Sequence, residues 1–232
     1  MQVHLHYCNT NIMQIDKENY YQVLKEVRTV KASVVAVSKT KSIEAVRELY
    51  DLGQRDFGEN YVQELVEKQA QLPADIRWHF IGHLQTNKVK YIAPFVHLIH
   101  GIDSLKLLKE VNKQAKKFNR TINVLLQIHI AREETKFGFG EGEINTNLVH
   151  ELQEFKNIQV IGLMGMASFS DDANLVRDEF RSLKTLFDTC VELQTSNFKP
   201  QILSMGMSAD YKTALEEGST MVRIGSLLFG NR

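Results

Sequence analysis

The sequence predicts an α/β fold, and three observations favour a single (β/α)8 barrel of the TIM type. Short apolar segments alternate with amphipathic segments along the chain, which is the pattern of parallel βα units. About eight strand candidates occur, the number that closes such a barrel. Only 3 of the 232 residues are proline, and no low-complexity linker interrupts the pattern, so we expect one domain over residues 1–232.

The first half of the chain is expected to begin with a helix over about residues 14–30, where apolar side chains recur at helical spacing. Strands and helices then follow in turn, marked by β-branched runs and by glycine at several ends. The expected strands are residues 34–38, 56–58, 76–81 and 96–99, and the helices that follow the first two are residues 43–52 and 61–70.

The second half continues the alternation of strands and helices. The expected strands are residues 121–130, 160–164, 201–203 and 221–224, and the expected helices are residues 105–118, 148–155, 176–190 and 209–217. Arg232 follows the last strand closely, which leaves no room for a full final helix. We therefore expect the N-terminal helix to cover the gap between the first and last strands.

Composition argues against several classes of function. Lys plus Arg and Asp plus Glu number 28 each, so no global field attracts nucleic acid or an anionic membrane. Cys8 and Cys190 are too few for a disulfide framework, which favours a reducing compartment. We see neither a signal peptide nor an apolar stretch of membrane-spanning length, so we expect a cytoplasmic protein.

Lys39 is the first candidate for a chemical role, because it stands at the end of the apolar segment 34–38. A lysine at the carboxyl end of a buried parallel strand lies on the rim where barrel active sites are built. Partial desolvation lowers the pKa of such an amine and leaves a nucleophilic fraction, as a Schiff-base lysine requires. The alternative is an ordinary solvated lysine, and a second lysine, Lys41, lies two residues on.

Two turns near the C-terminus are suited to hold a phosphate group. They follow the last two expected strands and contain Gly206 with Ser208 and Gly225 with Ser226. In barrels, phosphate commonly sits on these two loops, where glycine lets backbone N–H groups approach and serine adds hydroxyl donors. The alternative is ordinary turn chemistry, with Ser208 as a helix N-cap.

Three further residues have both a structural and a functional interpretation. Arg223 lies inside an apolar strand, where it forms either a structural ion pair or a bond to a ligand nitrogen or phosphate. Asn60 is either a site residue or an N-cap at a strand-to-helix junction. His79 is either a core histidine or a site residue.

A metal site is not expected. His79 with His83, and His4 with His6, are the histidine pairs that could suggest one. Neither pair has a convincing third ligand in the sequence.

Six segments in this order resemble the pyridoxal phosphate homeostasis proteins, single-domain relatives of the N-terminal barrel of alanine racemase. The resemblance runs from about residue 33 to the end of the chain. Ser168 stands where proline is common in that family, and the segment before Ser33 is atypical, but neither touches the shared motifs. The segments are residues 35–41 (VAVSKTK), 57–61 (FGENY), 78–88 (WHFIGHLQTNK), 162–167 (GLMGMA), 203–208 (LSMGMS) and 222–232 (VRIGSLLFGNR).

This resemblance implies a barrel of the alanine racemase N-terminal type without a second β domain, binding pyridoxal 5′-phosphate. Lys39 would carry the cofactor as a Schiff base, and Arg223 would face the pyridine nitrogen. The phosphate would be held by Ser208, Gly225 and Ser226, and the cofactor pocket would be lined by Asn60, His79 and Met166.

An arginine beside the pyridine nitrogen limits the chemistry. Its guanidinium keeps its proton, so it donates to an unprotonated ring, which is a weaker electron sink than a pyridinium. Racemisation also needs a proton donor on the face opposite the lysine, which a tyrosine from a second domain contributes in the two-domain racemases. Tyr61 could take that place, although no sequence feature assigns it.

Three functions are therefore compatible with the sequence. The resemblance implies a carrier with little or no catalysis, which binds, buffers and delivers pyridoxal phosphate, with apo-enzymes as recipients. The alternative is a weak pyridoxal-phosphate-dependent amino-acid racemase. The third is a cofactor-free Schiff-base enzyme such as an aldolase, in which Arg223 would need another purpose. The near-neutral charge and the expected absence of a second domain favour a monomer.

Overall fold

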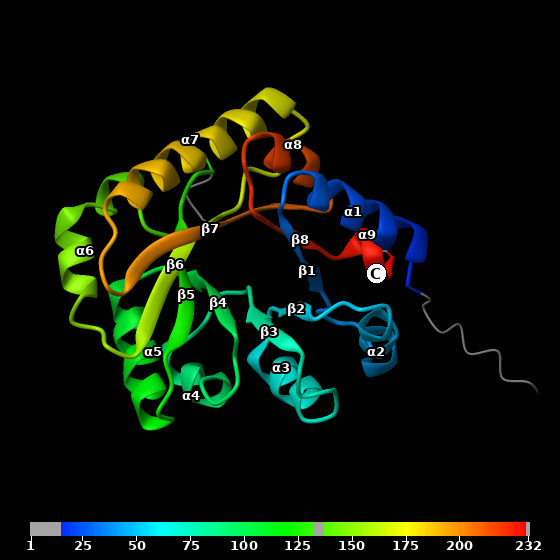
Figure 1. The fold of residues 1–232 in the computed structure, drawn as a ribbon, viewed down its shortest axis with the longest axis horizontal. Helices are drawn as coiled ribbons and strands as arrows, with labels where there is room; N and C mark the ends of the chain where they lie inside the picture. Colours follow the sequence, from blue (N-terminus) through cyan, green and yellow to red (C-terminus); the bar gives the residue numbers. More distant parts are fainter. Residues whose placement is uncertain (1–14, 132–136, 231–232) are drawn as a thin grey trace, which may run out of the picture.

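The computed structural model describes residues 15–131 and 137–230, and over this part of the chain eight parallel strands close into one barrel (Figure 1). Each strand pairs with the next, and the last pairs with the first. The predicted α/β barrel is confirmed. The strands are β1 (Ser33–Val37), β2 (Asp56–Glu59), β3 (Arg77–Phe80), β4 (Leu98–Ile102), β5 (Ile122–Ile128), β6 (Ile158–Gly165), β7 (Phe198–Met207) and β8 (Met221–Ile224).

Helices surround the strands on the outside of the barrel (Figure 1). Side chains of Ser, Asp or Asn cap the start of five of them by accepting a backbone N–H. The helices are α1 (Lys17–Thr29), α2 (Ile43–Asp51), α3 (Val62–Gln69), α4 (Val89–Ile92), α5 (Leu105–Lys117), α6 (Thr146–Leu152), α7 (Ala173–Glu192), α8 (Tyr211–Glu216) and α9 (Ser226–Phe229), with 3-10 turns η1 (Thr86–Lys88) and η2 (Glu141–Glu143).

Three elements with weak local patterns, α4, α9 and the start of β7, are not evident in the sequence. The four-residue helices α4 and α9 are too short to show a helical period. Strand β7 begins at Phe198, three residues before the expected start, and contains Pro200. Proline lacks the N–H of a ladder bond, and the pairing of β6 with β7 shifts its register there, so local sequence disguises the strand.

The core has two apolar layers, as expected for a barrel of this type. The larger layer lies between the strands and the helices. The smaller one fills the barrel interior and is built by Val35, Leu98, Leu125, Met164 and Met221 from five different strands. The interior is therefore packed, and ligands have access only at its ends.

Helix α1 packs against β1 and against α9, the short helix that follows β8. The backbone N–H of Asp16 donates to Leu228 O at 2.8 Å, which ties the start of α1 to α9 (Figure 1). The Tyr20 hydroxyl donates to Gln54 Oε1 at 3.3 Å, and the Tyr211 hydroxyl of α8 donates to Glu26 at 2.7 Å. These hydrogen bonds hold α1 against α9, α8 and Gln54, which follows α2.

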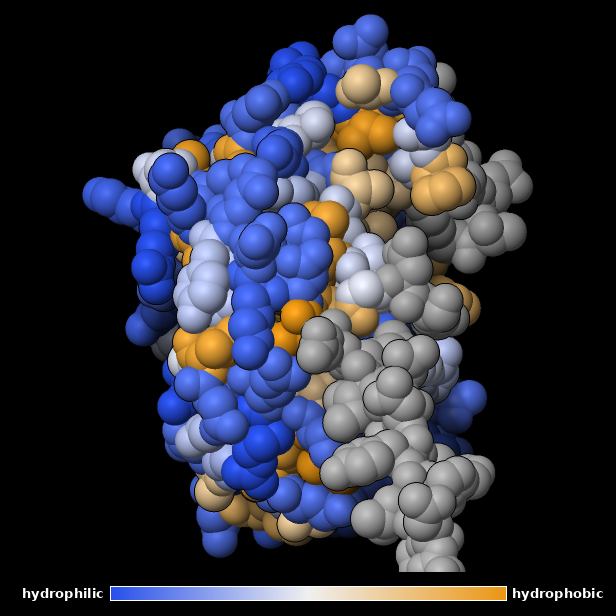
Figure 2. Space-filling model, turned by 90° about the vertical axis from the view of Figure 1, so that its right-hand side faces the viewer, coloured by the Kyte–Doolittle hydropathy of each residue, from blue (hydrophilic) through white to orange (hydrophobic). Residues whose placement is uncertain are grey.

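The face that carries α1 and α2 is mostly hydrophilic, and its hydrophobic residues form small separate patches (Figure 2). Within residues 15–131 and 137–230, none of the helices combines the length and the apolar character needed to cross a bilayer.

Candidate functional site

Most of the predicted site residues meet at one mouth of the barrel, because the carboxyl ends of parallel strands all open on the same side. They lie on β6, β7, β8, β1 and β2, which are consecutive around the closed barrel. Closure alone brings the first strand beside the last. The residues just beyond these strand ends are Met166, Ser208, Gly225, Ser226, Lys39 and Asn60.

The turns after β7 and β8 touch one another. The backbone N–H of Gly225 donates to Ser208 Oγ at 3.1 Å. Gly206 has a φ of +93°, and a Cβ there would lie 2.5 Å from the Cβ of Ala214, so only glycine fits. The Met207 N–H donates to Asp210 Oδ1 at 2.6 Å and fixes the turn. We call the turns formed by residues 206–208 and 225–226 the glycine cradle.

Lys39 lies in the turn after β1 and is half-buried. The following residue, Thr40, has a φ of +62°, a left-handed conformation that is strained for a β-branched side chain. Its N–H donates to Glu64 Oε1 at 2.5 Å, which holds the turn in this conformation. Backbone strain is therefore stored at the residue directly after Lys39.

A buried cluster of charges lies beneath this turn. Lys68 Nζ donates to Ser38 O at 2.6 Å, to Glu59 Oε1 at 2.8 Å and to Glu64 Oε1 at 2.7 Å. The Ser38 hydroxyl also donates to Glu59 Oε1, at 2.6 Å. Burial raises the pKa of Glu59, and the nearby ammonium of Lys68 opposes that shift. We call Ser38, Glu59, Glu64 and Lys68 the lysine clamp.

The lysine clamp is not evident in the amino-acid sequence. Glu59 lies at the end of the strand that was predicted as residues 56–58, and Lys68 lies in a helix where lysine is ordinary. The sequence alone does not show that Glu59 and Lys68 are buried. The signal that could have found them is Glu59 itself, since a carboxylate at the end of a buried strand needs a partner.

Arg223 is buried, with 4% of its surface exposed. Its Nη1 donates to Ser204 O at 2.9 Å and to Ser204 Oγ at 2.8 Å, and its Nη2 donates to Gly165 O at 3.1 Å. Burial lowers the pKa of Arg223 to about 10, and the charge of Asp210 opposes this shift. The group is still protonated at neutral pH, and its acceptors are neutral oxygens instead of a carboxylate partner.

Like Arg223, His79 lies within a strand and is buried. It belongs to β3, and its ring contacts His100 Nε2 at 2.9 Å and Asp56 Oδ1 at 3.0 Å. Its predicted contact with a ligand stays a prediction. His100, fully buried in β4, and Ser204 of β7 were not singled out from the sequence, because each lies in an apolar strand without a motif.

Two of the predicted pocket residues, Asn60 and Met166, directly follow the ends of β2 and β6. The Oδ1 atom of Asn60 is buried and accepts no hydrogen bond within the described part of the chain. Gly82 packs against the backbone of Asn60, so closely that a Cβ on Gly82 would lie 2.5 Å from Asn60 O. Met166 is half-buried and packs on the interior apolar layer.

Metal ligation is not supported by a cluster in residues 15–131 and 137–230, where no group of three or more His, Cys, Asp or Glu side chains could hold an ion. His4, His6 and Cys8 lie outside the described residues. Cys190 is buried in α7, and burial raises the pKa of its thiol to about 11.

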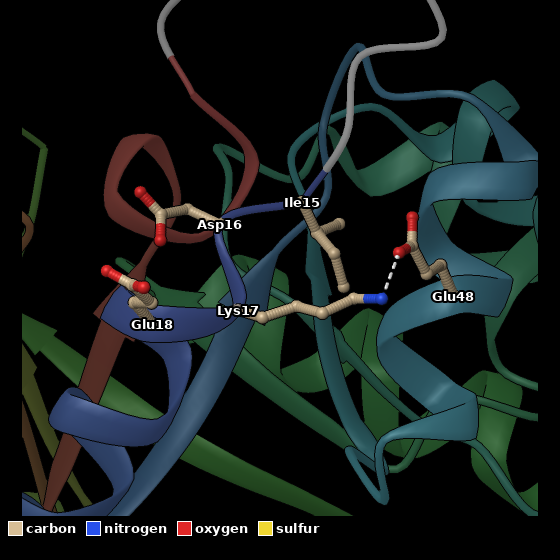
Figure 3. A pocket seen from close by; sticks show the side chains of 5 residues that line it. All are labelled: Ile15, Asp16, Lys17, Glu18 and Glu48. Atoms are coloured by element: carbon tan, nitrogen blue, oxygen red, sulfur yellow. Dashed lines mark ion pairs between the residues drawn. The ribbon is translucent and has the colours of Figure 1, made fainter.

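A separate surface pocket lies at the start of α1, on the outside of the barrel (Figure 3). It has a volume of about 470 Å³ and contains an ion pair of 2.9 Å between Lys17 and Glu48. Asp16 and Glu18 add two more carboxylates, so the pocket is unsuited to an anion. Lys39 is not among the residues that line it.

Comparison with known proteins shows a relationship along nearly the whole chain. The family described as "Alanine racemase, N-terminal domain" matches residues 15–232. A pyridoxal phosphate homeostasis protein of Aquifex aeolicus is 44% identical over 203 residues, which is 87% of each chain. One from Homo sapiens is 39% identical over 219 residues, covering 90% of this chain and 79% of the relative.

Solved structures show the same relationship. PipY of Synechococcus elongatus, solved without pyridoxal phosphate, has a TM-score of 0.84 and 32% identity, covering 95% of this chain and all of that one. The same protein with pyridoxal phosphate bound has a TM-score of 0.81. An alanine racemase of Clostridium difficile shares the fold, with a TM-score of 0.72 at 17% identity over 57% of its length. The chain therefore belongs to the pyridoxal phosphate homeostasis proteins, within the alanine racemase N-terminal domain family.

Proposed function

We propose that this protein binds pyridoxal 5′-phosphate and serves its homeostasis, by binding the cofactor, limiting its free aldehyde and delivering it to apo-enzymes. The observation that carries the proposal is the placement of Lys39 on the same mouth as the glycine cradle and the buried Arg223. Relatives at 37–44% identity are named for this role, and a structural neighbour has been solved with pyridoxal phosphate bound.

The residues at the mouth fit each part of the cofactor. A phosphate suits the glycine cradle, where glycine and serine leave backbone and hydroxyl donors near two strand ends. A ring nitrogen suits Arg223, because a guanidinium has five N–H donors and three hydrogen bonds are formed within the described chain. An aldehyde suits Lys39, and the buried Asn60 Oδ1 can accept from a ligand donor.

Covalent attachment of the aldehyde to Lys39 balances without a further reagent. The neutral Nζ amine adds to the aldehyde carbon and forms a carbon–nitrogen bond. The carbonyl oxygen leaves as water with the two amine hydrogens, and a carbon–nitrogen double bond remains. The lysine clamp fixes the backbone on both sides of Lys39 and so limits the directions in which its amine can point.

The chain's own residues favour binding over catalysis. When bound, pyridoxal phosphate can act as an electron sink for amino-acid chemistry. Arg223 keeps its proton and donates a hydrogen bond, so it cannot supply the protonated ring that a strong sink requires. A racemase also needs a second acid or base, and Tyr61, an exposed residue next to Asn60, is the candidate that the alternative function would use.

The decisive experiment is the visible absorption spectrum of the protein mixed with pyridoxal phosphate, before and after borohydride. We expect a band that borohydride removes, with the reduced adduct mapped to Lys39 by peptide mass. Lys39→Ala should lose the band and keep the thermal stability of the parent, since a half-buried rim side chain leaves no core cavity. Lys90→Ala, at an exposed lysine of α4, is the matched control.

Two further measurements separate the carrier from the alternatives. Exchange of the amino-acid α-proton for solvent deuterium would support a racemase, and its absence at full cofactor occupancy would support a carrier. Transfer of the bound cofactor to an apo-enzyme, followed by recovery of that enzyme's activity, tests delivery. A protein that takes up no pyridoxal phosphate would contradict both functions and favour a cofactor-free Schiff-base enzyme.

The proposed setting is a monomer in the cytoplasm. The charge balance of the chain supports it, since 28 basic residues offset 28 acidic ones and leave no field for nucleic acid or membranes. Sedimentation velocity tests the monomer, and a species of twice the mass would overturn it.

A further inference from the structure

A continuous chain of polar side chains crosses the barrel interior beneath the mouth. It begins at Arg223 and passes through Ser204, His100 and His79 to Asp56 at the start of β2. The successive distances between the bonded atoms are 2.8, 3.0, 2.9 and 3.0 Å. Ser204, His100 and His79 are at most 1% exposed, so water cannot replace any of these bonds.

The direction of the first two bonds follows from Arg223. A guanidinium donates hydrogen bonds and accepts none, so Ser204 Oγ must accept from Nη1. Ser204 then has one hydroxyl hydrogen left, and the atom in reach is His100 Nδ1. That nitrogen must carry a lone pair, which places the ring hydrogen of a neutral His100 on Nε2.

The remaining bonds follow in the same direction. His100 Nε2–H donates to His79 Nδ1, so the hydrogen of a neutral His79 also lies on Nε2. His79 Nε2–H then donates to Asp56 Oδ1, and an ionised carboxylate can only accept. Arg223 can only donate and the ionised Asp56 can only accept. Both ends therefore require the same direction of donation, with one hydrogen in each bond.

The charges around the chain agree with this arrangement. Burial lowers the pKa of His100 well below its ordinary value, and His79, Arg223 and His97 lower it further. Burial alone would raise the pKa of Asp56, but hydrogen bonds from His79 and Arg77 lower it overall. A neutral His100 and an ionised Asp56 are therefore the forms that this arrangement requires.

The row of hydrogen bonds ends at Arg223, which still has donors available for a ligand. Three of the five N–H groups of Arg223 donate to Ser204 and Gly165, and the other two make no hydrogen bond within the described part of the protein. The Nε atom of Arg223 forms none of these bonds and is not among the buried atoms that lack a partner, so an acceptor from outside the protein can reach it.

We propose that His79 and His100 are positioning residues that act through Ser204 to hold Arg223, with its two unused donors directed at the ring nitrogen of the bound cofactor. The role toward the cofactor rests on the proposed function. The direction of the hydrogen bonds from Arg223 to Asp56 is a property of the protein alone. It can therefore be tested separately from the role toward the cofactor.

The first test needs no cofactor. Long-range ¹H–¹⁵N spectra of the labelled protein at pH 7 should show both His79 and His100 as neutral rings with the hydrogen on Nε2. His79→Gln and His100→Gln assign the signals. A hydrogen on Nδ1 of either ring, or a doubly protonated ring, would overturn the chain even if the protein binds pyridoxal phosphate normally.

The second test reads the effect on the cofactor. His100→Leu breaks the chain and should weaken pyridoxal phosphate binding about tenfold, the effect of one misplaced charged hydrogen bond. It should also shift the absorption maximum of the bound cofactor. His100→Gln, whose amide can accept from Ser204 and donate to His79, should restore both properties to within about twofold.

Controls keep this test decisive. His97→Gln alters an exposed ring 5.5 Å from His79 that forms no bond of the chain, and it should bind like the parent. If His100→Leu fails to fold, Ser204→Ala removes one hydroxyl and should show the same spectral shift. Equal binding and spectra in the Leu and Gln variants would overturn the positioning role, whereas a protein that binds no pyridoxal phosphate at all would overturn the proposed function and leave the first test standing.

Discussion

The two sides of the barrel mouth hold their residues by different means. On the β1–β2 side, the lysine clamp places a buried ammonium between two carboxylates and a carbonyl, directly beneath Lys39. On the β7–β8 side, the glycine cradle is held by backbone geometry, with a left-handed Gly206 and a Gly225 N–H bonded to Ser208.

The difference matches what the proposed function requires of each side. An amine that forms a covalent bond must approach from one direction, and fixed charges beneath its turn restrict that direction. A phosphate needs several N–H donors at short range, which only a backbone free of bulky side chains can provide. The charged side is therefore sensitive to loss of a charge, and the glycine side is sensitive to added volume.

Breaking the lysine clamp should have the most severe consequence for stability. Lys68→Met leaves Glu59 buried without its cation and should lower the free energy of unfolding by about 3–5 kcal/mol, measured by urea denaturation. Lys113→Met, at an exposed lysine paired with Glu110, should cost less than about 1 kcal/mol. Similar losses in both variants would show that the clamp contributes no more than a surface ion pair.

Added volume tests the other side. Gly206→Ala combines a left-handed backbone with a clash against Ala214, and it should cost about 1–3 kcal/mol in urea denaturation. Gly53→Ala shares the positive φ but has open space, and Gly142→Ala has open space without a positive φ. We expect the losses to fall in that order, and an equal loss at Gly53 would assign the effect to backbone strain alone.

Acid should lower the free energy of unfolding through His100, which is buried in the barrel interior between the two sides. His100 is held neutral in the folded protein, whereas in the unfolded chain it takes up a proton near its ordinary pKa of 6.5. The unfolded state then binds more protons, so the free energy of unfolding falls as pH drops below 6.5, by about 1.4 kcal/mol per unit for one group.

Urea denaturation at pH 7.5 and 5.5 measures this dependence, and His100→Gln should reduce it. Asp56 does not interfere, because its lowered pKa keeps it ionised across this interval. An unchanged pH dependence in the variant would assign the proton uptake to another histidine.

The smallest expected change concerns the phosphate. Ser226→Asp places a negative charge at the exposed start of α9 and should weaken pyridoxal phosphate binding about fivefold through repulsion in a solvated setting. Ser226→Asn, which adds no charge, is the control, and binding of pyridoxal without its phosphate should not change. Equal affinities in the Asp and Asn variants would place the phosphate elsewhere.

Local pattern was enough to predict the barrel and most of the rim residues. Alternating apolar and amphipathic segments define parallel βα units, and residues just past strand ends must then share one mouth. Lys39, Ser208 and Gly225 were found in this way, because a strand end is visible in the sequence itself. Elements without a full local period, such as α4 and the first three residues of β7, were missed.

The sequence by itself determined the strand order, the residues at each strand end and the excess of donors at Arg223. Only the tertiary structure decided which side chains meet. Barrel closure places β8 beside β1, and the lysine clamp and the histidine chain join residues that are up to 104 positions apart. Such contacts depend on packing across several strands, which no local period encodes, so a buried lysine and an exposed one look the same until the chain is folded.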